Sequence, residues 1–393
     1  MKLPRGFLAS GVRAGIRKKR PDVALIVAER GANAAAVFTQ NRFQAAPVVL
    51  SRAALKKSGG RVKGVVVNAG CANAITGEPG MDAARRVRAR AAELLGCPEH
   101  EIFVASTGVI GFVLPDDKVR AALPDARTRL SASGLDAASQ AILTTDVGPK
   151  VAQTSFESQG RRIRIVGFAK GAGMIHPNMA TMLGFVMTDA AATPEFLARS
   201  LKRAVATSFN AISVDGDTST NDTVLLMASG AAGGLVLATA QEGSAFDEAL
   251  EKVCRELAFM IVRDGEGASR VLAIEIRGAR NERDARVAAH AIGTSPLVKT
   301  ALNGGDPNWG RILAAVGRSG ARIATRKVSL QVGKVILVKN GAPAPYREKD
   351  AARAFSKERV ELTVDLGSGN ASTSLLTCDL GHDYVSLNTD YRS

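Results

Sequence analysis

The chain has 393 residues, of which 46% are apolar and 23% are charged, so it is long enough for two or three globular domains and is not a largely disordered chain. Its formal net charge is +15, but no aromatic residues are interleaved with the basic clusters, so we predict a solvated basic surface and no nucleic-acid partner. No apolar run approaches the roughly 20 residues of a membrane helix, and no signal-peptide core is visible, which predicts a cytoplasmic protein without a membrane partner.

Short runs rich in β-branched residues recur along the chain and predict buried strands. These runs lie at residues 24–28, 64–69, 101–106, 162–169, 184–189, 223–229 and 270–276. Between them, apolar residues at helical spacing predict helices at residues 81–95, 193–209 and 244–261. Gly96 closes the first helix, Thr193 and Pro194 begin the second, and Ser244 with Asp247 gives the third a capping signal.

The alternation of strands and helices predicts an α/β fold. Near residues 277–286 the composition shifts to the polar run RGARNERDAR, which indicates a connector between domains. We therefore expect a large α/β domain over residues 1–280 and a smaller C-terminal α/β domain over residues 281–393.

The four cysteines and four histidines are scattered along the chain. No two cysteines have the C-x-x-C spacing, and no H-E-x-x-H motif is present. We therefore predict reduced thiols, no protein-bound metal and no bound cofactor. The cysteines are Cys71, Cys97, Cys254 and Cys378.

Six polar stretches rich in Gly, Asn and Thr lie at the ends of predicted strands. Each one alone is as consistent with turn chemistry as with function. Together they indicate one site assembled from distant loops, which are well suited to present side chains. The stretches are NAGCANAITGEPG at 68–80, ASTGVIG at 105–111, TTD at 144–146, VDGDTSTNDT at 214–223, DGEGAS at 264–269 and NTDYRS at 388–393.

Thr181 stands where the loop HPNMA meets the predicted strand GFVMTD. A threonine here can simply form a local hydrogen bond at the start of a strand. It can also be a nucleophile, because an N-terminal Thr uses its own α-amine as the base that activates its hydroxyl. That chemistry requires the chain to be cut between Ala180 and Thr181, and we hypothesise self-cleavage at this bond.

The segment KGAGMIHPNMATMLGFVMTD resembles the self-processing segment of the ornithine acetyltransferases, which are glutamate N-acetyltransferases of the cyclic arginine pathway. The resemblance runs nearly end to end, through PRGFLASGVRAGI, VNAGCANAITG, STGVIG, DTSTNDT, DGEGAS and DPNWGRILAAVGRSG. It implies a layered sandwich of mixed β-sheets with flanking helices, and a smaller domain whose tail returns to the active site. It also implies an α-chain of residues 1–180, a β-chain from residue 181, and an α2β2 heterotetramer.

The resemblance implies a role for each matching residue. Thr181 is expected to be the nucleophile, and Thr107 and Gly108 are expected to form the oxyanion hole. The expected activity is ping-pong transfer of acetyl from N2-acetylornithine to L-glutamate, with acetyl-CoA left open as a second donor. The residues expected to contact substrate are Thr144, Lys170, Thr181, Glu266, Asn388 and Ser393.

Two other functions remain open at this point. The chain could be a self-processing aminopeptidase of the same superfamily, although Lys170 and the NTDYRS tail are not expected there. It could also be a non-catalytic, basic nucleic-acid-binding protein. Lys170 could be an ordinary surface lysine and Glu266 a turn carboxylate. The sequence departs from the family pattern at Asn303, Gly305, Ser269, Gly381 and His382, which bears on the shape of the substrate pocket.

Overall fold

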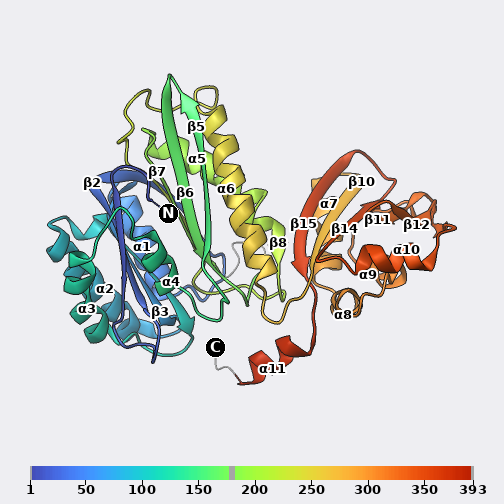
Figure 1. The fold of residues 1–393 in the computed structure, drawn as a ribbon, viewed down its shortest axis with the longest axis horizontal. Coiled ribbons are helices and arrows are strands. Elements are labelled where there is room, and N and C mark those ends of the chain that lie inside the picture. Colours follow the sequence, from blue (N-terminus) through green and yellow to red (C-terminus); the bar gives the residue numbers. More distant parts are fainter. Residues whose placement is uncertain (1, 177–181, 391–393) are drawn as a thin grey trace. The chain divides into compact units, whose positions relative to one another are not determined.

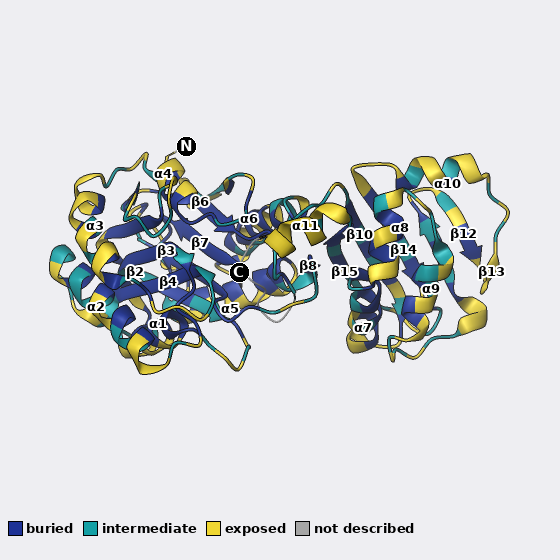
Figure 2. Ribbon diagram, turned by 90° about the horizontal axis from the view of Figure 1, so that it is seen from below, coloured by how far each residue is buried: buried dark blue, intermediate teal, exposed yellow. Residues whose placement is uncertain are grey.

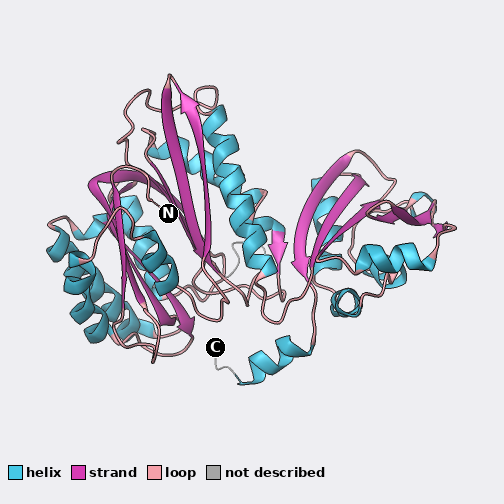
Figure 3. Cartoon of the chain, viewed as in Figure 1, coloured by secondary structure: helices cyan, strands magenta, loops and turns pink. Residues whose placement is uncertain are grey.

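The computed structural model describes residues 2–176 and 182–390. It divides the chain into two compact units, one made of Met1–Asn210 with Asp217–Ile261 and the other of Ala211–Gly216 with Val262–Arg392. Helices and strands are mixed within each unit (Figure 1; Figure 3). The α/β class that the sequence predicted is therefore confirmed.

The first unit holds an eight-stranded mixed sheet in the order β4-β3-β2-β9-β7-β6-β5, with β1 paired to β2. The pairs β3–β4 and β7–β9 are parallel, and the other pairs are antiparallel. The strands are β1 (Phe7–Val12), β2 (Val23–Phe38), β3 (Arg61–Cys71), β4 (Ile102–Val109), β5 (Lys150–Ser158), β6 (Arg161–Lys170), β7 (Leu183–Thr188) and β9 (Thr223–Ala228).

Strand β2 belongs to both halves of this sheet. Its first half pairs with β3 and its second half with β9, and the register with β3 shifts between Val27 and Ala32, where Gly31 has a φ of +76°. One hydrophobic core joins residues of β3 and β4 to residues of β6, β7 and β9. The rings of Phe38 on β2 and Phe103 on β4 also stack at 5.9 Å. The two halves therefore pack face to face, which confirms the layered arrangement that the resemblance implied.

Helices cover the outer faces of these two layers. The α2 and α3 side chains pack on the outer face of β2, β3 and β4, and α6 packs on β6, where a β-carbon on Gly167 would lie 3.0 Å from Leu257. Strand β7, between the core and the α6 side, is buried along its whole length (Figure 2). The helices of this unit are α1 (Ala46–Lys57), α2 (Gly77–Leu95), α3 (Asp116–Thr128), α4 (Leu135–Ala141), α5 (Pro194–Ala206) and α6 (Ser244–Arg263).

The three helices predicted from sequence are α2, α5 and α6. Gly96 ends α2 with a left-handed φ of 61°, the conformation that glycine adopts at low cost. Thr193 caps α5, because its hydroxyl oxygen accepts a hydrogen bond from the Phe196 N–H at 3.2 Å. Local capping chemistry therefore fixes these helix ends.

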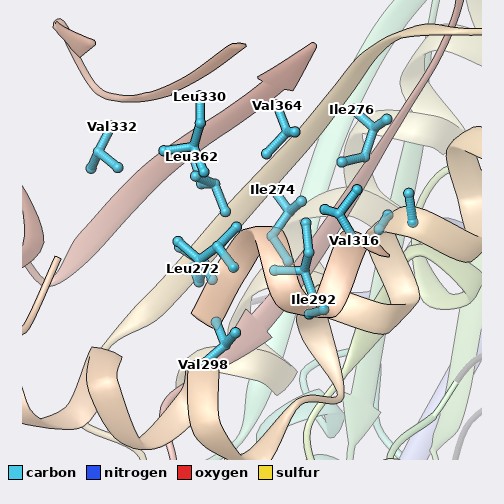
Figure 4. Packing of buried hydrophobic residues seen from close by; sticks show 14 of the residues in the cluster. Leu272, Ile274, Ile276, Ile292, Val298, Val316, Leu330, Val332, Leu362 and Val364 are labelled. Carbon is cyan, nitrogen blue, oxygen red and sulfur yellow. The ribbon is translucent and has the colours of Figure 1, made fainter. Parts of the chain in front are cut away.

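The second unit contains a seven-stranded sheet in the order β13-β12-β11-β14-β10-β15-β8. Its core is formed by aliphatic side chains of the sheet, including Leu272, Ile274 and Ile276, packed against helix residues such as Ile292 (Figure 4). The strands are β8 (Ile212–Ser213), β10 (Val271–Ala279), β11 (Ser329–Val332), β12 (Val335–Lys339), β13 (Ala342–Pro343), β14 (Arg359–Asp365) and β15 (Ala371–Cys378). The helices are α7 (Glu282–Gly293), α8 (Pro296–Gly304), α9 (Trp309–Gly317), α10 (Glu348–Phe355) and α11 (His382–Asp390).

The division between the units differs from the boundary expected after residue 280. Strand β10 lies inside the second sheet, where it pairs with β14 and β15, so it belongs to the second unit. The polar run at 277–286 is the end of β10 and the start of α7, where Asn281 caps the helix by accepting a hydrogen bond from Asp284 N–H. Helix-capping chemistry, rather than a linker, explains that change in composition.

Candidate active site

Three strand ends meet at one edge of the sheet in the first unit. The register pairs Lys170, the last residue of β6, with Leu183, the first residue of β7. Leu183 in turn pairs with Thr223, the first residue of β9. This edge therefore brings Lys170 next to the start of β7, the strand that follows residue 181 in the chain.

Lys170 is only 4% exposed, so it is not a surface lysine. Its Nζ donates a hydrogen bond to Thr107 Oγ1 at 3.2 Å and lies 4.0 Å from Asp146 Oδ2. The structure thus brings together two residues that the sequence proposed separately, one for substrate binding and one for the oxyanion hole.

Asp146, in the TTD stretch, is the acceptor that organises this region. Its Oδ1 accepts hydrogen bonds from Lys150 Nζ at 2.6 Å and from Gly171 N–H at 2.7 Å, and its Oδ2 accepts one from Thr144 N–H at 2.9 Å. Burial disfavours the ionised form, but the charges of Lys170 and Lys150 outweigh burial and hold the pKa of the Asp146 carboxyl well below its usual value. Asp146 is therefore an anion between two buried lysines.

The TTD stretch was expected to contact substrate through Thr144. Its hydroxyl lies 3.5 Å from Asp146 Oδ2, and its carbonyl accepts a hydrogen bond from Arg17 Nη2 at 3.3 Å. Both Thr144 and Thr145 are half-buried. The choice between these two threonines therefore stays a prediction.

Gly108 lies where β4 comes very close to β3. Its φ is +132°, and a β-carbon at this position would lie 2.3 Å from the carbonyl carbon of Gly70. No other residue fits this space without moving the backbone. The conformation and the close approach together explain the glycine that follows Thr107.

Asn221 connects the two layers beside this edge. Its Nδ2 donates to the carbonyl oxygens of Ala72 at 2.7 Å and Ser106 at 2.8 Å. The next residue, Asp222, accepts a hydrogen bond from the Met182 N–H at 3.1 Å. The sequence analysis named the stretch VDGDTSTNDT but assigned no residue in it to the site. An amide and an acid directly before a predicted strand were the signal that could have indicated Asn221 and Asp222.

Glu266 and Asn388 meet within the second unit. Asn388 Nδ2, on α11, donates to Glu266 Oε2 at 2.8 Å and to Tyr384 O at 3.0 Å. Gly267 permits this contact, because a β-carbon there would lie 2.5 Å from Tyr384 N. Two of the residues expected to contact substrate are thus in direct contact with each other.

Asp379 holds the loop that carries Glu266. It accepts hydrogen bonds from Ser269 N–H at 2.8 Å, Ser269 Oγ at 2.6 Å, Arg270 N–H at 2.9 Å and Asn303 Nδ2 at 2.7 Å. A β-carbon on Gly381 would lie 2.8 Å from that Asn303 amide nitrogen. Three of the departures from the family pattern, at residues 269, 303 and 381, therefore belong to one hydrogen-bonded cluster.

Thr181, Ala180 and Ser393 lie outside the described residues. His176 is half-buried, and burial lowers its pKa against the opposing charge of Asp217.

All four cysteines are free, as predicted. Among residues 2–176 and 182–390, no group of three or more His, Cys, Asp or Glu side chains could hold a metal ion, and no helix is long and apolar enough to cross a membrane.

Comparison with known proteins identifies the family. The ArgJ family matches over residues 8–393. The arginine biosynthesis bifunctional protein ArgJ of Caldanaerobacter subterraneus is 45% identical over 100% of this chain and 98% of its own length, and that of Geobacter sulfurreducens is 46% identical over 99% of each chain. A crystal structure of the Bacillus halodurans protein of the same name is 39% identical, with a TM-score of 0.51 over 53% of this chain and 98% of that chain.

The two-layered α/β fold, in which the buried Lys170 at the end of β6 donates a hydrogen bond to Thr107 on β4, is therefore that of an acetyltransferase of arginine biosynthesis. The chain belongs to the ArgJ family. This confirms the resemblance to the ornithine acetyltransferases, and it argues against a non-catalytic, nucleic-acid-binding protein.

Proposed function

We propose that this chain cuts itself between Ala180 and Thr181, and that Thr181 then carries an acetyl group from N2-acetylornithine to L-glutamate. The observation that carries this proposal is the hydrogen bond from Lys170 to Thr107, at the strand edge where β7 begins. A buried ammonium group beside a hydroxyl is an electrostatic environment suited to a developing oxyanion.

The cleavage step needs a nucleophile and a place for negative charge. The Thr181 hydroxyl oxygen attacks the carbonyl carbon of Ala180, the bond to the Thr181 nitrogen breaks, and water then hydrolyses the resulting ester. Chain 1–180 is left with a carboxylate, and the chain from 181 is left with a free α-amine. Proteins with an N-terminal threonine use this amine as their general base.

Thr107 and Gly108 are proposed as the oxyanion hole. Because Lys170 donates to Thr107 Oγ1, the hydroxyl oxygen acts there as an acceptor, and its own hydrogen remains available to donate to a substrate oxygen. Donation from a cation also polarises that hydroxyl in a low-dielectric site. The Gly108 N–H is the proposed second donor.

Transfer then follows in two half-reactions. The Thr181 oxygen attacks the acetyl carbonyl of N2-acetylornithine, the α-amine of ornithine leaves with a proton, and an acetyl ester remains on Thr181. The α-amine of glutamate attacks that ester and regenerates the Thr181 hydroxyl. The same oxyanion donors serve both half-reactions, since each passes through a tetrahedral intermediate.

Substrate recognition is proposed for Thr144, Lys170, Glu266, Asn388 and Ser393. A lysine ammonium can pair with the substrate carboxylate, and the Glu266 carboxylate can meet the δ-ammonium of ornithine. Burial of Lys170 and the Asn388–Glu266 hydrogen bond support these roles, because both side chains are held in defined positions.

We further infer an α2β2 assembly of two α- and two β-chains in the cytoplasm. Acetyl-CoA is proposed as a second acetyl donor that binds as a substrate, and the word bifunctional in the names of the relatives supports this second activity. The basic chain, with its net charge of +15, is compatible with an anionic donor.

One preparation tests this function. Intact-mass measurement and N-terminal sequencing of the purified protein should give a fragment that begins TMLGFV, and the preparation should transfer acetyl from N2-acetylornithine to glutamate. Thr181→Ala should remain full-length and inactive. A protein that cuts at this bond but hydrolyses peptides and transfers no acetyl would be an aminopeptidase instead.

A further inference from the structure

Arg17 differs from the other residues of its basic run. The run RKKR covers residues 17–20 in the loop between β1 and β2, and its last three residues are exposed, whereas Arg17 is half-buried. The Arg17 guanidinium donates hydrogen bonds to the backbone oxygens of Leu143 and Thr144, which lie far away in the sequence. The solvated basic surface expected from the sequence therefore does not explain this side chain.

Asp22 holds the backbone of Arg17 in place. This residue is buried directly before β2, and its Oδ1 accepts a hydrogen bond from the Ala14 N–H at 2.6 Å. Its Oδ2 accepts hydrogen bonds from the Gly15 N–H at 3.1 Å and the Arg17 N–H at 2.8 Å. Such hydrogen bonds between a short acidic side chain and nearby backbone groups define the conformation of a loop. The loop therefore gives Arg17 a fixed origin.

The stem of Arg17 lies against Gly70, near the end of β3. A β-carbon on Gly70 would lie 2.8 Å from Arg17 Cγ and 3.0 Å from Ile16 Cγ2. Gly70 is paired with Gly108 of β4, and a β-carbon on Gly108 would lie 2.3 Å from the carbonyl carbon of Gly70. Because atoms packed this closely cannot shift independently, Arg17 has a defined position relative to Gly108, the proposed oxyanion donor.

The guanidinium of Arg17 extends from this stem to the TTD stretch. Its Nη2 lies 3.3 Å from the carbonyl oxygen of Thr144, and its Nη1 donates to the preceding carbonyl, that of Leu143. The N–H of the same Thr144 donates to Asp146 Oδ2 at 2.9 Å. A cation and an anion thus hold the Thr144 backbone from its two sides, and hydrogen bonds to charged groups are stronger than those between neutral groups.

We propose that Arg17 is a positioning residue for acetyl transfer, which fixes the Thr144 hydroxyl relative to Gly108 before substrate binds. This inference rests on the proposed function, in which Thr144 contacts substrate and Gly108 is an oxyanion donor. A hydroxyl that is already held in place lowers the ordering cost of binding. Arginine suits this role because its planar guanidinium presents several N–H donors in fixed directions and can hold two carbonyl oxygens at once.

Three variants test this role. Arg17→Met keeps the methylene groups that lie against Gly70 and removes the guanidinium. Arg17→Lys keeps a cation, but its ammonium group is a compact charge without the fixed fork of donors. Thr144→Val keeps the shape of the side chain and removes the hydroxyl that Arg17 is proposed to position.

The matched control is Arg164→Met. Arg164 also donates to two consecutive backbone oxygens, those of Lys2 at 2.8 Å and Leu3 at 3.4 Å. It lies on β6, in the half of the strand away from Lys170. Its loss should lower the melting temperature and leave the KM for N2-acetylornithine unchanged.

We expect Arg17→Met to cleave itself, because the packing against Gly70 and Gly108 is kept. Its KM for N2-acetylornithine should rise about 10-fold, the size of one lost hydrogen bond, with kcat nearly unchanged. Thr144→Val should raise that KM by a similar factor, and Arg17→Lys should give an intermediate value. The double variant Arg17→Met with Thr144→Val should be no worse than Thr144→Val alone, because Arg17 acts through Thr144.

Three results would overturn this inference. The first is a wild-type KM in both Arg17→Met and Arg17→Lys, and the second is a double variant in which the two effects multiply, because Arg17 would then act independently of Thr144. The third is a wild-type KM in Thr144→Val, which would remove Thr144 from substrate binding. Failure of the proposed function is a separate result, since wild-type protein would then transfer no acetyl group from N2-acetylornithine.

Discussion

The two units of this protein hold their proposed functional residues in opposite environments. In the first unit, Lys170 and Asp146 are buried and act on each other through charge. In the second unit, Asn388 is exposed on α11, and its contact with the half-buried Glu266 is a hydrogen bond at the surface. Interactions between charges are far stronger in a low-dielectric interior, so we assign the acetyl-transfer chemistry to the first region and recognition of the ornithine side chain to the second.

Lys170→Met should cause the largest loss of acetyl-transfer activity among the substitutions that test this difference between the two units. It removes the donor to Thr107 and one of the two cations beside Asp146, so acetyl transfer should fall at least ~10³-fold in a kinetic assay. Stability should fall by about 3–5 kcal/mol, because a buried anion loses a partner.

Lys150→Met is the matched control for that variant. Its Nζ lies 2.6 Å from Asp146 Oδ1, so its loss should destabilise the fold to a similar degree. Its activity, measured below the melting temperature, should fall much less than that of Lys170→Met. Equal losses of activity would mean that the charge network is structural only.

Gly108→Ala should be the next most damaging change. The added β-carbon would lie 2.3 Å from Gly70 and would force the proposed oxyanion donor to move, so both self-cleavage and transfer should fall about 10²–10³-fold. Gly111→Ala also has a positive φ, of +88°, but meets no atom within 4 Å and serves as the control. Normal cleavage by Gly108→Ala would remove residue 108 from the mechanism.

Glu266→Gln should affect only the binding of N2-acetylornithine. The amide keeps the shape and can still bond Asn388, but it loses the charge that meets the ornithine δ-ammonium, so KM for N2-acetylornithine should rise about 10-fold at an unchanged extent of self-cleavage. Asn388→Ala should raise that KM only a few-fold. A fall in kcat without a change in KM would contradict the division between the two regions.

The smallest effect concerns acid stability. Because Lys170 and Lys150 lower the pKa of Asp146 in the folded protein, this carboxylate stabilises the fold above its unfolded pKa of about 3.9. That contribution is lost as pH falls through the lower folded pKa. As the pH falls from 6, the melting temperature should therefore fall more steeply for wild type than for Asp146→Asn. Parallel curves of melting temperature against pH would contradict an ionised Asp146 in the folded protein.

Local signals in the sequence explain which features could be predicted. Thr193 and Gly96 mark helix ends by capping chemistry that needs no tertiary contact. The family resemblance of the STG and KGAG segments predicted that Thr107 and Lys170 belong to one site. In the structure, Lys170 Nζ lies 3.2 Å from Thr107 Oγ1.

The buried acids could not be assigned in the same way. Whether Asp146 or Asp222 is buried, charged or unpaired depends on lysines and backbone groups from other strands. A single sequence does not show which of these groups lie next to each acid. The domain boundary was misplaced for a related reason, since the polar run that ends β10 and begins α7 looks like a linker until its helix cap at Asn281 is seen. Tertiary contacts decide these features.

The proposed mechanism is tested most directly by the mass of each chain after brief mixing of the purified protein with N2-acetylornithine and no glutamate. We expect two chains, with one added acetyl group on the chain that begins at Thr181, and loss of that group when glutamate is added. Acetyl transfer by a protein that stays full-length, or an acetyl group on any other residue, would contradict it.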